Sequence, residues 1–503
     1  MDCAAVTGLD LSGVTDAPVT IHSATVVTTG APAPYCDVRG TIAPADTIVL
    51  RLPLNGWTQR YMQTGCGGLC GNASINYGQA ATCPPDTDGT VAGATTDMGH
   101  QGQNDGSWAA GNPQAQIDFA YRGVHVTSQA AKAIIAVFYG RPPAYSYFTG
   151  CSDGGREALM EAQRHPGDFD GIAAGAPANN MVVQNTFHHA WNVLTNIDGN
   201  GAYILLAGKL PLIHNAVLAA CDGRDGLRDG VLDDPRTCDF DPATLVCAAG
   251  QDPASCLSPA EAGVVRRLHD GAVDERGRRL EPAVAHEWGS ELAWTLFVPA
   301  AQGQHTEVHR RVVLEHRAVL QLPVYLSAMD PDLDRFQRGG GKLLLWHGWN
   351  DQHIAPRGTL AYYDALRETM GARTADRFAR LYLFPGVAHC GGGEGPNTFD
   401  VLTPVMAWVE SGRQPGKIVA SNASAGRTRP VYPYPQVARY DGTGSTDDAA
   451  NFVPRTPRPE PRTDLRWLGE RLYSSDYQTW CTAAGTKLVC RPAETWLTRR
   501  KST

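Results

Sequence analysis

The chain has 503 residues, of which 19% are charged and 43% belong to the hydrophobic set, a composition typical of a globular protein. Its formal net charge of −8 argues against a nucleic-acid partner, because binding to phosphates requires a basic face. No apolar run reaches the length that spans a membrane, so we expect no membrane partner. A chain of this length predicts a main domain that carries a large insertion.

The cysteines indicate an oxidising compartment. Thirteen are many for a reducing environment, and they do not form the two C-x-x-C pairs of a zinc ribbon. Short spacings inside loops predict three disulfides: Cys221–Cys238, Cys247–Cys256 and Cys481–Cys490. The opening MDCAAVTGLD has neither a basic start nor an apolar core, so we interpret the sequence as the mature form of a secreted or periplasmic protein.

The segment GCSDG at residues 150–154 matches the G-x-S-x-G pattern of a nucleophile elbow. Strand-forming residues precede it at 147–149, and apolar residues recur at helical spacing after it until Pro166. The strand, the turn and the helix that the pattern requires are therefore all predicted, with Ser152 as the nucleophile. The alternative is a surface serine in an ordinary glycine-rich turn.

An acid and a base follow in the chain order that α/β-hydrolases use. Asp351 comes after the apolar run LLLW, and His389 comes after the run LYLF, in a glycine-rich loop. Both loops are expected at the carboxyl edge of a parallel sheet. We predict that His389 takes the proton of Ser152 and that Asp351 orients the imidazole. His347 and His353, which flank Asp351, are the alternative bases.

Two cysteines adjoin the predicted nucleophile and base. Cys151 precedes Ser152, and Cys390 follows His389. Catalysis requires the serine and the histidine within hydrogen-bond reach, which also brings their neighbours close, and a disulfide needs Cα atoms only about 5–6 Å apart. We therefore predict a Cys151–Cys390 disulfide, worth up to roughly 5 kcal/mol in the chain-entropy model. The alternative is two buried free thiols.

With these residues in place, the sequence resembles the tannase and feruloyl esterase family, which includes bacterial enzymes that split mono(2-hydroxyethyl) terephthalate. The resemblance runs from about Cys3 to Val453. It is carried by the segments SYFTGCSDGGREALMEAQRHPGDFDGIAAGAPA, GGGKLLLWHGWNDQHIAP, LFPGVAHCGGGEGPNTFDVLTPVMAWVESGRQP and RTRPVYPYPQVARY. The family implies an α/β-hydrolase fold with a large lid inserted after the elbow helix, and a serine esterase that acts on small aromatic esters.

The resemblance suggests three regions. We expect the catalytic domain at residues 1–177 and 336–454, the lid domain at 178–335, and a linker with a C-terminal extension of unknown role at 455–503. Four aromatic residues of the lid are candidates to stack on an aromatic acyl group, although such residues more often form a core. They are Trp191, Trp288, Trp294 and Phe297.

The resemblance also implies an oxyanion hole and one more disulfide. The two backbone N–H donors map to Gly68 and Asp153, and such donors stabilise a tetrahedral oxyanion by several kcal/mol. For Gly68 the alternative is a glycine-rich turn without a catalytic part. The N-terminal bridge of the family maps to Cys3–Cys36. Three cysteines then remain, which predicts one free thiol or an intermolecular bond: Cys66, Cys70 and Cys83.

The lid contains an acidic loop, CDGRDGLRDGVLDDPRTC, at residues 221–238. It lacks the acidic spacing and the distal glutamate of an EF-hand, but hard oxygens in a turn-rich loop suit Ca²⁺. The resemblance implies a structural calcium and no organic cofactor. The alternative is a solvated acidic loop. The implied ligands are the side chains of Asp222, Asp225 and Asp229 and the carbonyls of Leu227 and Val231.

The sequence therefore predicts a secreted serine esterase for esters of small aromatic acids, such as gallate, ferulate or a terephthalate half-ester. A catalytically silent binding protein of the same fold is one alternative. A redox protein that uses Cys151 or the free cysteine is another.

Overall fold

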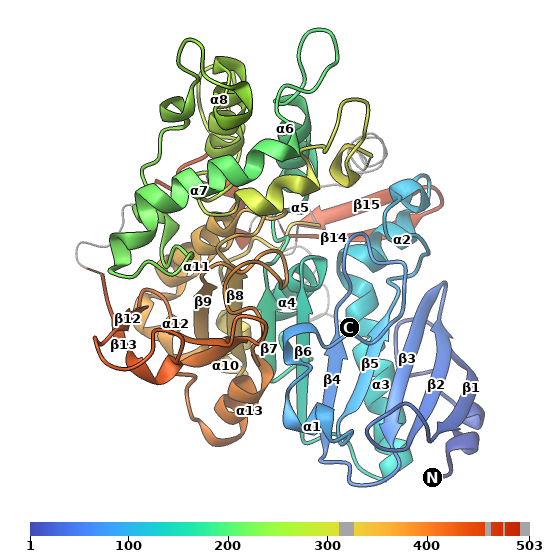
Figure 1. Cartoon of the computed structure of the whole chain (residues 1–503). Helices are drawn as coiled ribbons and strands as arrows, with labels where there is room; N and C mark the ends of the chain where they lie inside the picture. The colour runs from blue at the N-terminus through green and yellow to red at the C-terminus, as the bar shows by residue number, and fades with distance from the viewer. Residues whose placement is uncertain (311–325, 458–463, 476–477, 493–503) are drawn as a thin grey trace.

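The computed structural model describes residues 1–310, 326–457, 464–475 and 478–492. Its centre is one nine-stranded sheet in the order β1-β2-β3-β5-β4-β6-β7-β8-β9 (Figure 1). The strands are β1 (Val19–Val27), β2 (Tyr35–Ile42), β3 (Asp46–Pro53), β4 (Arg60–Thr64), β5 (Ala92–Thr96), β6 (Tyr145–Cys151), β7 (Gly171–Gly175), β8 (Lys342–Gly348) and β9 (Ala379–Phe384).

The sheet is antiparallel on one side and parallel on the other. Strands β1, β2, β3 and β5 pair antiparallel, whereas β5, β4, β6, β7, β8 and β9 pair parallel. Parallel strands are buried on both faces, which explains the continuous apolar runs within β8 and β9. Their carboxyl ends share one edge, where β6 leads into the predicted elbow. The predicted α/β fold is confirmed.

Helices cover both faces of the sheet (Figure 1). One face packs α3, α4, α11 and α12, and the other packs α13, so that side chains of β4, β6, β7, β8 and β9 alternate between two hydrophobic clusters. In β8, Leu343 and Leu345 join the first cluster, and Leu344 and Trp346 join the second. The helices are α1 (Pro84–Thr87), α2 (Pro113–Ile117), α3 (Gly123–Tyr139), α4 (Asp153–Arg164), α11 (Pro356–Met370), α12 (Ala372–Phe378) and α13 (Leu402–Ser411).

Between β7 and β8 the chain leaves the sheet and forms an inserted region above its carboxyl edge (Figure 1). This region has its own hydrophobic cluster, which contains Trp288, Trp294 and Phe297 at no more than 2% exposure. These three aromatic residues are therefore core residues, and their proposed stacking on an acyl group is wrong. The described helices here are α5 (Met181–Val183), α6 (His189–Leu194), α7 (Leu210–Cys221) and α8 (Pro259–Asp270), whereas α10 (Asp334–Arg338) packs on the main core through Phe336 (Figure 1).

Three small antiparallel hairpins complete the described chain. They pair β10 (Ile418–Asn422) with β11 (Arg427–Val431), β12 (Val437–Tyr440) with β13 (Phe452–Arg455), and β14 (Thr479–Ala484) with β15 (Lys487–Pro492). The last hairpin belongs to the C-terminal extension and is closed by the predicted Cys481–Cys490 bridge, whose cysteines lie opposite each other in register.

Six disulfides are present. The five predicted pairs all lie at bonding distance, and Cys66 pairs with Cys70. Cys83 is a buried free thiol beside Met406 and Thr403, so the odd cysteine is accounted for within the chain.

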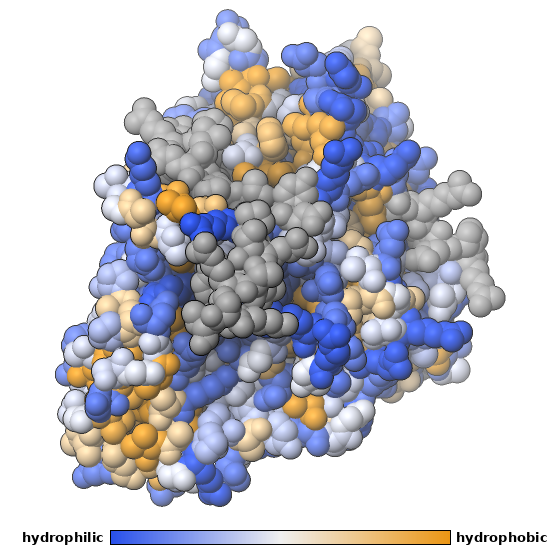
Figure 2. All heavy atoms as spheres, turned by 180° about the vertical axis from the view of Figure 1, so that it is seen from behind, coloured by the Kyte–Doolittle hydropathy of each residue, from blue (hydrophilic) through white to orange (hydrophobic). Residues whose placement is uncertain are grey.

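The surface mixes hydrophilic and apolar groups. Figure 2 shows the back of the molecule, where apolar atoms gather on the side of β1 and α3. Val26 in β1 and Val137 in α3 are 52% and 47% exposed. Among the helices that the structure describes, none combines the length and apolarity needed to cross a bilayer.

The packing of α4 on β7 provides a test of the fold. A Cβ atom added to Gly155 would lie 2.3 Å from the Gly175 carbonyl oxygen, whereas one added to Gly358 in α11 meets nothing within 4 Å. We expect Gly155→Ala to reduce the free energy of unfolding by about 1–3 kcal/mol through overpacking. Gly358→Ala should instead raise it by about 0.5–1 kcal/mol through helix propensity. Denaturant titrations check both, and equal effects of the two changes would contradict this packing.

Candidate active site

Ser152 occupies a sharp turn between β6 and α4. Its backbone lies at φ 67° and ψ −121°, a conformation that costs a non-glycine residue of order 1–3 kcal/mol. Two hydrogen bonds hold it: the Ser152 N–H donates to the Gly175 carbonyl and the Ala178 N–H donates to the Ser152 carbonyl, each at 3.0 Å. This is the strand, turn and helix geometry predicted for the G-x-S-x-G pattern.

The glycines around Ser152 are required by close backbone contacts. A Cβ atom on Gly150 would lie 2.5 Å from the Gly154 carbonyl oxygen, and one on Gly154 would lie 2.9 Å from the Cys66 carbonyl oxygen. These distances are shorter than real Cβ contacts, so larger residues would displace the turn. The elbow can therefore be this tight only because its neighbours lack side chains.

Asp351 follows β8 and is fully buried. Its Oδ1 accepts hydrogen bonds from the backbone N–H groups of His353 and Ile354, at 2.7 and 2.9 Å. Its Oδ2 lies 2.7 Å from His389 Nδ1 and 3.0 Å from His347 Nε2. Burial alone would raise the pKa of Asp351, but the adjacent His389 and the hydrogen bonds from both histidines hold this pKa well below its usual range. The carboxyl group is therefore ionised at neutral pH.

The three candidate histidines occupy different places. His389 contacts Asp351 and lines the same cavity as Ser152. His347 is fully buried behind Asp351, with its Nδ1 at 2.8 Å from Thr359 Oγ1, so it is placed to support the carboxylate. The His353 ring lines the cavity at 4.8 Å from the His389 ring, and only its backbone N–H reaches Asp351. This arrangement favours His389 as the base.

The cavity beside Ser152 has a volume of about 530 Å³, within the range of small-molecule sites. It lies at the carboxyl edge of the sheet and is lined by Gly68 and Trp346 as well as by Ser152 and His389. Gly68 has φ 64° and sits inside the ring closed by the Cys66–Cys70 disulfide.

The loop that carries Gly68 is attached to the elbow helix. The Gly154 N–H donates to the Cys66 carbonyl at 2.8 Å, and the Cys66 N–H donates to the buried Glu157 carboxyl group at 3.2 Å. Asp153 begins α4, and its side chain is turned away into an ion pair with Arg156 at 2.6 Å. Both predicted oxyanion donors therefore belong to segments that contact each other next to Ser152.

The Cys151–Cys390 disulfide joins the residue before Ser152 to the residue after His389, with its Cα atoms 5.9 Å apart. Its sulfur at Cys390 lies 3.6 Å from His389 Nε2. The bridge thus connects the end of β6 to the loop after β9, which are separated in the sheet by β7 and β8.

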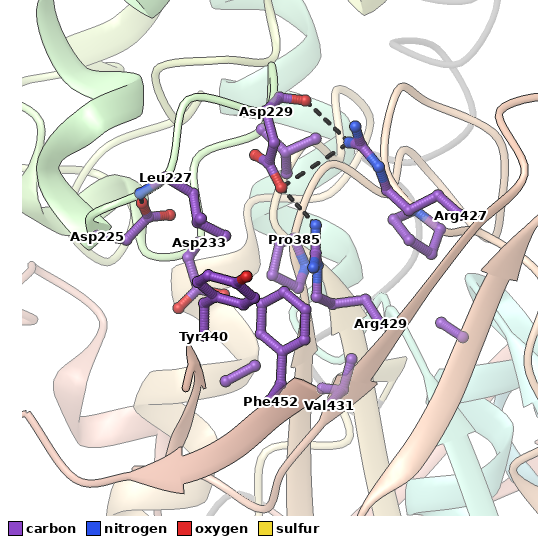
Figure 3. A pocket seen from close by; sticks show the side chains of 14 residues that line it. Asp225, Leu227, Asp229, Asp233, Pro385, Arg427, Arg429, Val431, Tyr440 and Phe452 are labelled. Atoms are coloured by element: carbon purple, nitrogen blue, oxygen red, sulfur yellow. Dashed lines mark hydrogen bonds and ion pairs between the residues drawn. The ribbon is translucent and has the colours of Figure 1, made fainter. Parts of the chain in front are cut away.

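The acidic loop of the inserted region surrounds a small cavity. Figure 3 shows Asp225, Asp229 and Asp233 around it, and Leu227 and Val231 also line it. Burial and the neighbouring carboxylates raise the pKa of Asp225 to about 6. These residues offer oxygens of the kind that Ca²⁺ prefers, but the three carboxylates do not converge within 4.8 Å of one another in this structure.

Two features of this loop differ from the calcium ligand set that the family resemblance implies. The Asp222 carboxylate turns toward the loop backbone and accepts a hydrogen bond from the Gly230 N–H at 3.1 Å, while Asp233 faces the cavity. Asp229 pairs with Arg429 and lies 3.9 Å from Arg427 (Figure 3). Sequence reasoning missed both arginines, because they follow the loop by about 200 residues and carry no local signal.

Comparison with known proteins decides the family. A family model described as tannase and feruloyl esterase matches residues 29–318 and 304–454. The chain belongs to the tannase and feruloyl esterase family. Within it, mono(2-hydroxyethyl) terephthalate hydrolase from Piscinibacter sakaiensis is 33% identical over 519 residues, covering 84% of this chain and 85% of that protein. An uncharacterized esterase from Xanthomonas campestris pv. campestris is 33% identical over 528 residues, covering 88% and 90%.

Solved structures agree with this membership in the tannase and feruloyl esterase family. Feruloyl esterase B from Aspergillus oryzae has a TM-score of 0.78 at 26% identity, covering 90% of this chain and all of that one. Tannin acyl hydrolase from Aspergillus niger has a TM-score of 0.73 at 21% identity, covering 92% and 96%, and shares the fold. The α/β-hydrolase fold is thereby confirmed, whereas residues 455–503 lie outside the family match.

The long-range disulfide of this family member can be tested directly. We expect Cys151→Ala/Cys390→Ala to reduce the free energy of unfolding by roughly 5 kcal/mol, because the bridge closes a loop of 239 residues. The control, Cys247→Ala/Cys256→Ala, opens a loop of only 9 residues and should cost about half as much. Denaturant titration measures both losses, and a smaller loss for the long loop would contradict the expectation.

Proposed function

We propose that this tannase and feruloyl esterase family member is a serine esterase that cleaves carboxylic esters of small aromatic acids. The observation that carries the proposal is the arrangement of three residues. Ser152 sits on a strained elbow in the same cavity as His389, and the His389 Nδ1 is held at 2.7 Å by the buried Asp351. A serine beside a histidine that a carboxylate orients is the arrangement of nucleophilic acyl transfer.

In the proposed mechanism, Ser152 Oγ attacks the acyl carbon while His389 Nε2 takes its proton. The Asp351 carboxylate keeps the Nδ1 proton of His389 in place and stabilises the imidazolium that forms. The backbone N–H groups of Gly68 and Asp153 donate to the oxyanion. His389 then returns the proton to the leaving alcohol, which leaves an acyl group on Ser152. A water molecule, deprotonated by His389, releases the acid.

The substrate class is supported by the relatives and by the cavity. The named relatives are a hydrolase of mono(2-hydroxyethyl) terephthalate and a feruloyl esterase, and both names specify an ester of an aromatic acid. The cavity of about 530 Å³ accommodates such an acyl group. We place a terephthalate half-ester and a feruloyl ester within the same proposed class.

The proposal includes a structural Ca²⁺ and an extracellular location. Asp225, Asp229, Asp233 and the Leu227 and Val231 carbonyls would hold the cation. Burial together with repulsion by neighbouring carboxylates raises the pKa of Asp225 and of Asp233, and the cation would offset this repulsion. Six disulfides support an oxidising environment.

Hydrolysis assays test the reaction. We expect the wild-type protein to cleave at least one of methyl gallate, methyl ferulate and mono(2-hydroxyethyl) terephthalate, with products followed by chromatography. Ser152→Ala should lower kcat at least about 10⁴-fold, and Asp351→Asn about 10⁴-fold because the His389 tautomer is lost. Ser411→Ala, at the exposed end of α13, is the matched control and should retain full activity. Cleavage of none of the three esters would refute the substrate class, and an active Ser152→Ala would refute the nucleophile.

Calcium removal tests the metal proposal. We expect a chelator to lower the midpoint of thermal unfolding, because a ligand present at 100 times its Kd stabilises the folded state by about 2.7 kcal/mol. Asp225→Asn should unfold at a lower temperature and respond less to the chelator. Asp88→Asn, at an exposed position, should respond as the wild type does. An unfolding midpoint that calcium and the chelator leave unchanged would show that the loop is only a solvated acidic loop.

A further inference from the structure

A second cavity, of about 710 Å³, lies between the hydrolase core and the C-terminal hairpin. It shares no lining residue with the cavity of Ser152. Helix α4 connects the two, because Ser152 precedes its first turn and Arg164 ends it. The remaining walls include Tyr121 from the core and Trp480 from β14.

The hairpin is attached to the core and forms a fixed wall of this cavity. The Tyr121 hydroxyl donates to the Cys481 carbonyl at 3.2 Å and accepts from the Cys481 N–H at 3.0 Å. Arg164 Nη1 donates to the Thr479 carbonyl at 2.8 Å, and Gln478 Nε2 donates to Asp330 Oδ2 at 2.7 Å. The Cys481–Cys490 bridge closes the hairpin at the point of attachment.

Arg164 forms no direct ion pair with a carboxylate among the described residues, and the negative charge of Asp330 acts on it only from farther away. Its side chain is buried, and its Nε has no hydrogen-bond partner among the described residues. Its guanidinium lies 4.5 Å from the centre of the Tyr121 ring and 5.3 Å from that of Trp480. Burial lowers the pKa of Arg164 to about 10, so the group remains charged at neutral pH. A buried charge without a counterion is unfavourable, and an anion would relieve it.

The two carboxylates on the cavity wall already have partners: Asp16 pairs with Arg122, which also binds Asp46 and Asp118, and Asp168 contacts His125 at 2.6 Å. Arg335 also lines the cavity and is exposed, so it adds a second cation beside Arg164.

We propose that this cavity binds a small aromatic carboxylate. Arg164 and Arg335 bind the carboxylate group, since a guanidinium matches a carboxylate with paired N–H donors. The aromatic ring packs against Trp480, next to Tyr121. The volume suits such a ligand, and the site goes beyond the proposed esterase reaction because none of its residues reaches Ser152.

The site depends on the C-terminal extension. Trp480 and the Thr479 carbonyl belong to the hairpin, and the hairpin lies outside the family match, which ends at residue 454. The inferred binding therefore requires the extension together with the hydrolase core that supplies Arg164 and Arg335.

Calorimetric titration of the full chain with benzoate tests the proposal, with benzamide as the uncharged probe of equal size. We expect saturable binding of benzoate that is at least tenfold tighter than that of benzamide. Arg164→Gln should weaken benzoate binding at least tenfold. Benzoate bound beside Ser152 would be unaffected by this substitution, so the result does not depend on whether the esterase proposal holds. Equal binding of the two probes, or of benzoate to wild type and Arg164→Gln, overturns the proposal.

Two further variants test the proposal in the case that Arg164→Gln does not fold. Arg335→Gln changes an exposed residue and should weaken benzoate several-fold while leaving benzamide unchanged. Trp480→Leu should weaken both probes, because it removes the aromatic wall but not the charge. Arg413→Gln, an exposed arginine just after α13, is the matched control and should bind as wild type does. Unchanged benzoate binding by both Arg335→Gln and Trp480→Leu also overturns the proposal.

Discussion

The backbone conformation of Ser152 is the constraint on which the rest of the site depends. A serine at φ 67° is unfavourable by itself, and it persists because the surrounding structure leaves no alternative. Backbone hydrogen bonds tie it to β7, and the neighbouring glycines approach other backbone atoms too closely to carry side chains. The segments on either side, β6 and α4, are buried in the main core, so relaxing the turn would require displacing the sheet.

Asp351 holds together the loops at the carboxyl edge of the sheet. Both of its carboxylate oxygens accept two hydrogen bonds, and one of them serves His347 and His389 together. His347 in turn contacts Thr359 in α11. The orientation of His389 is therefore connected to a helix of the core through a chain of buried polar contacts, which need no rearrangement when a proton is transferred.

Local patterns in the sequence predicted the parts of the molecule that depend on local chemistry. The elbow follows from a five-residue motif, and the loops of Asp351 and His389 follow from apolar runs that end at the same sheet edge. The packing of Trp288 and Trp294 could not be predicted, because the same side chains suit a core or a ligand site. Arg429 beside Asp229 is a contact across 200 residues, for which the sequence has no local pattern.

The six disulfides differ in what must happen before each can form. Five of them join cysteines 4 to 33 residues apart, so their thiols meet within short loops at small entropic cost. Cys151 and Cys390 are 239 residues apart and meet only when β6 and the loop after β9 have taken their places across the sheet. Oxidation of this pair therefore marks molecules in which Ser152 and His389 have already come together, and it would lock only correctly assembled chains.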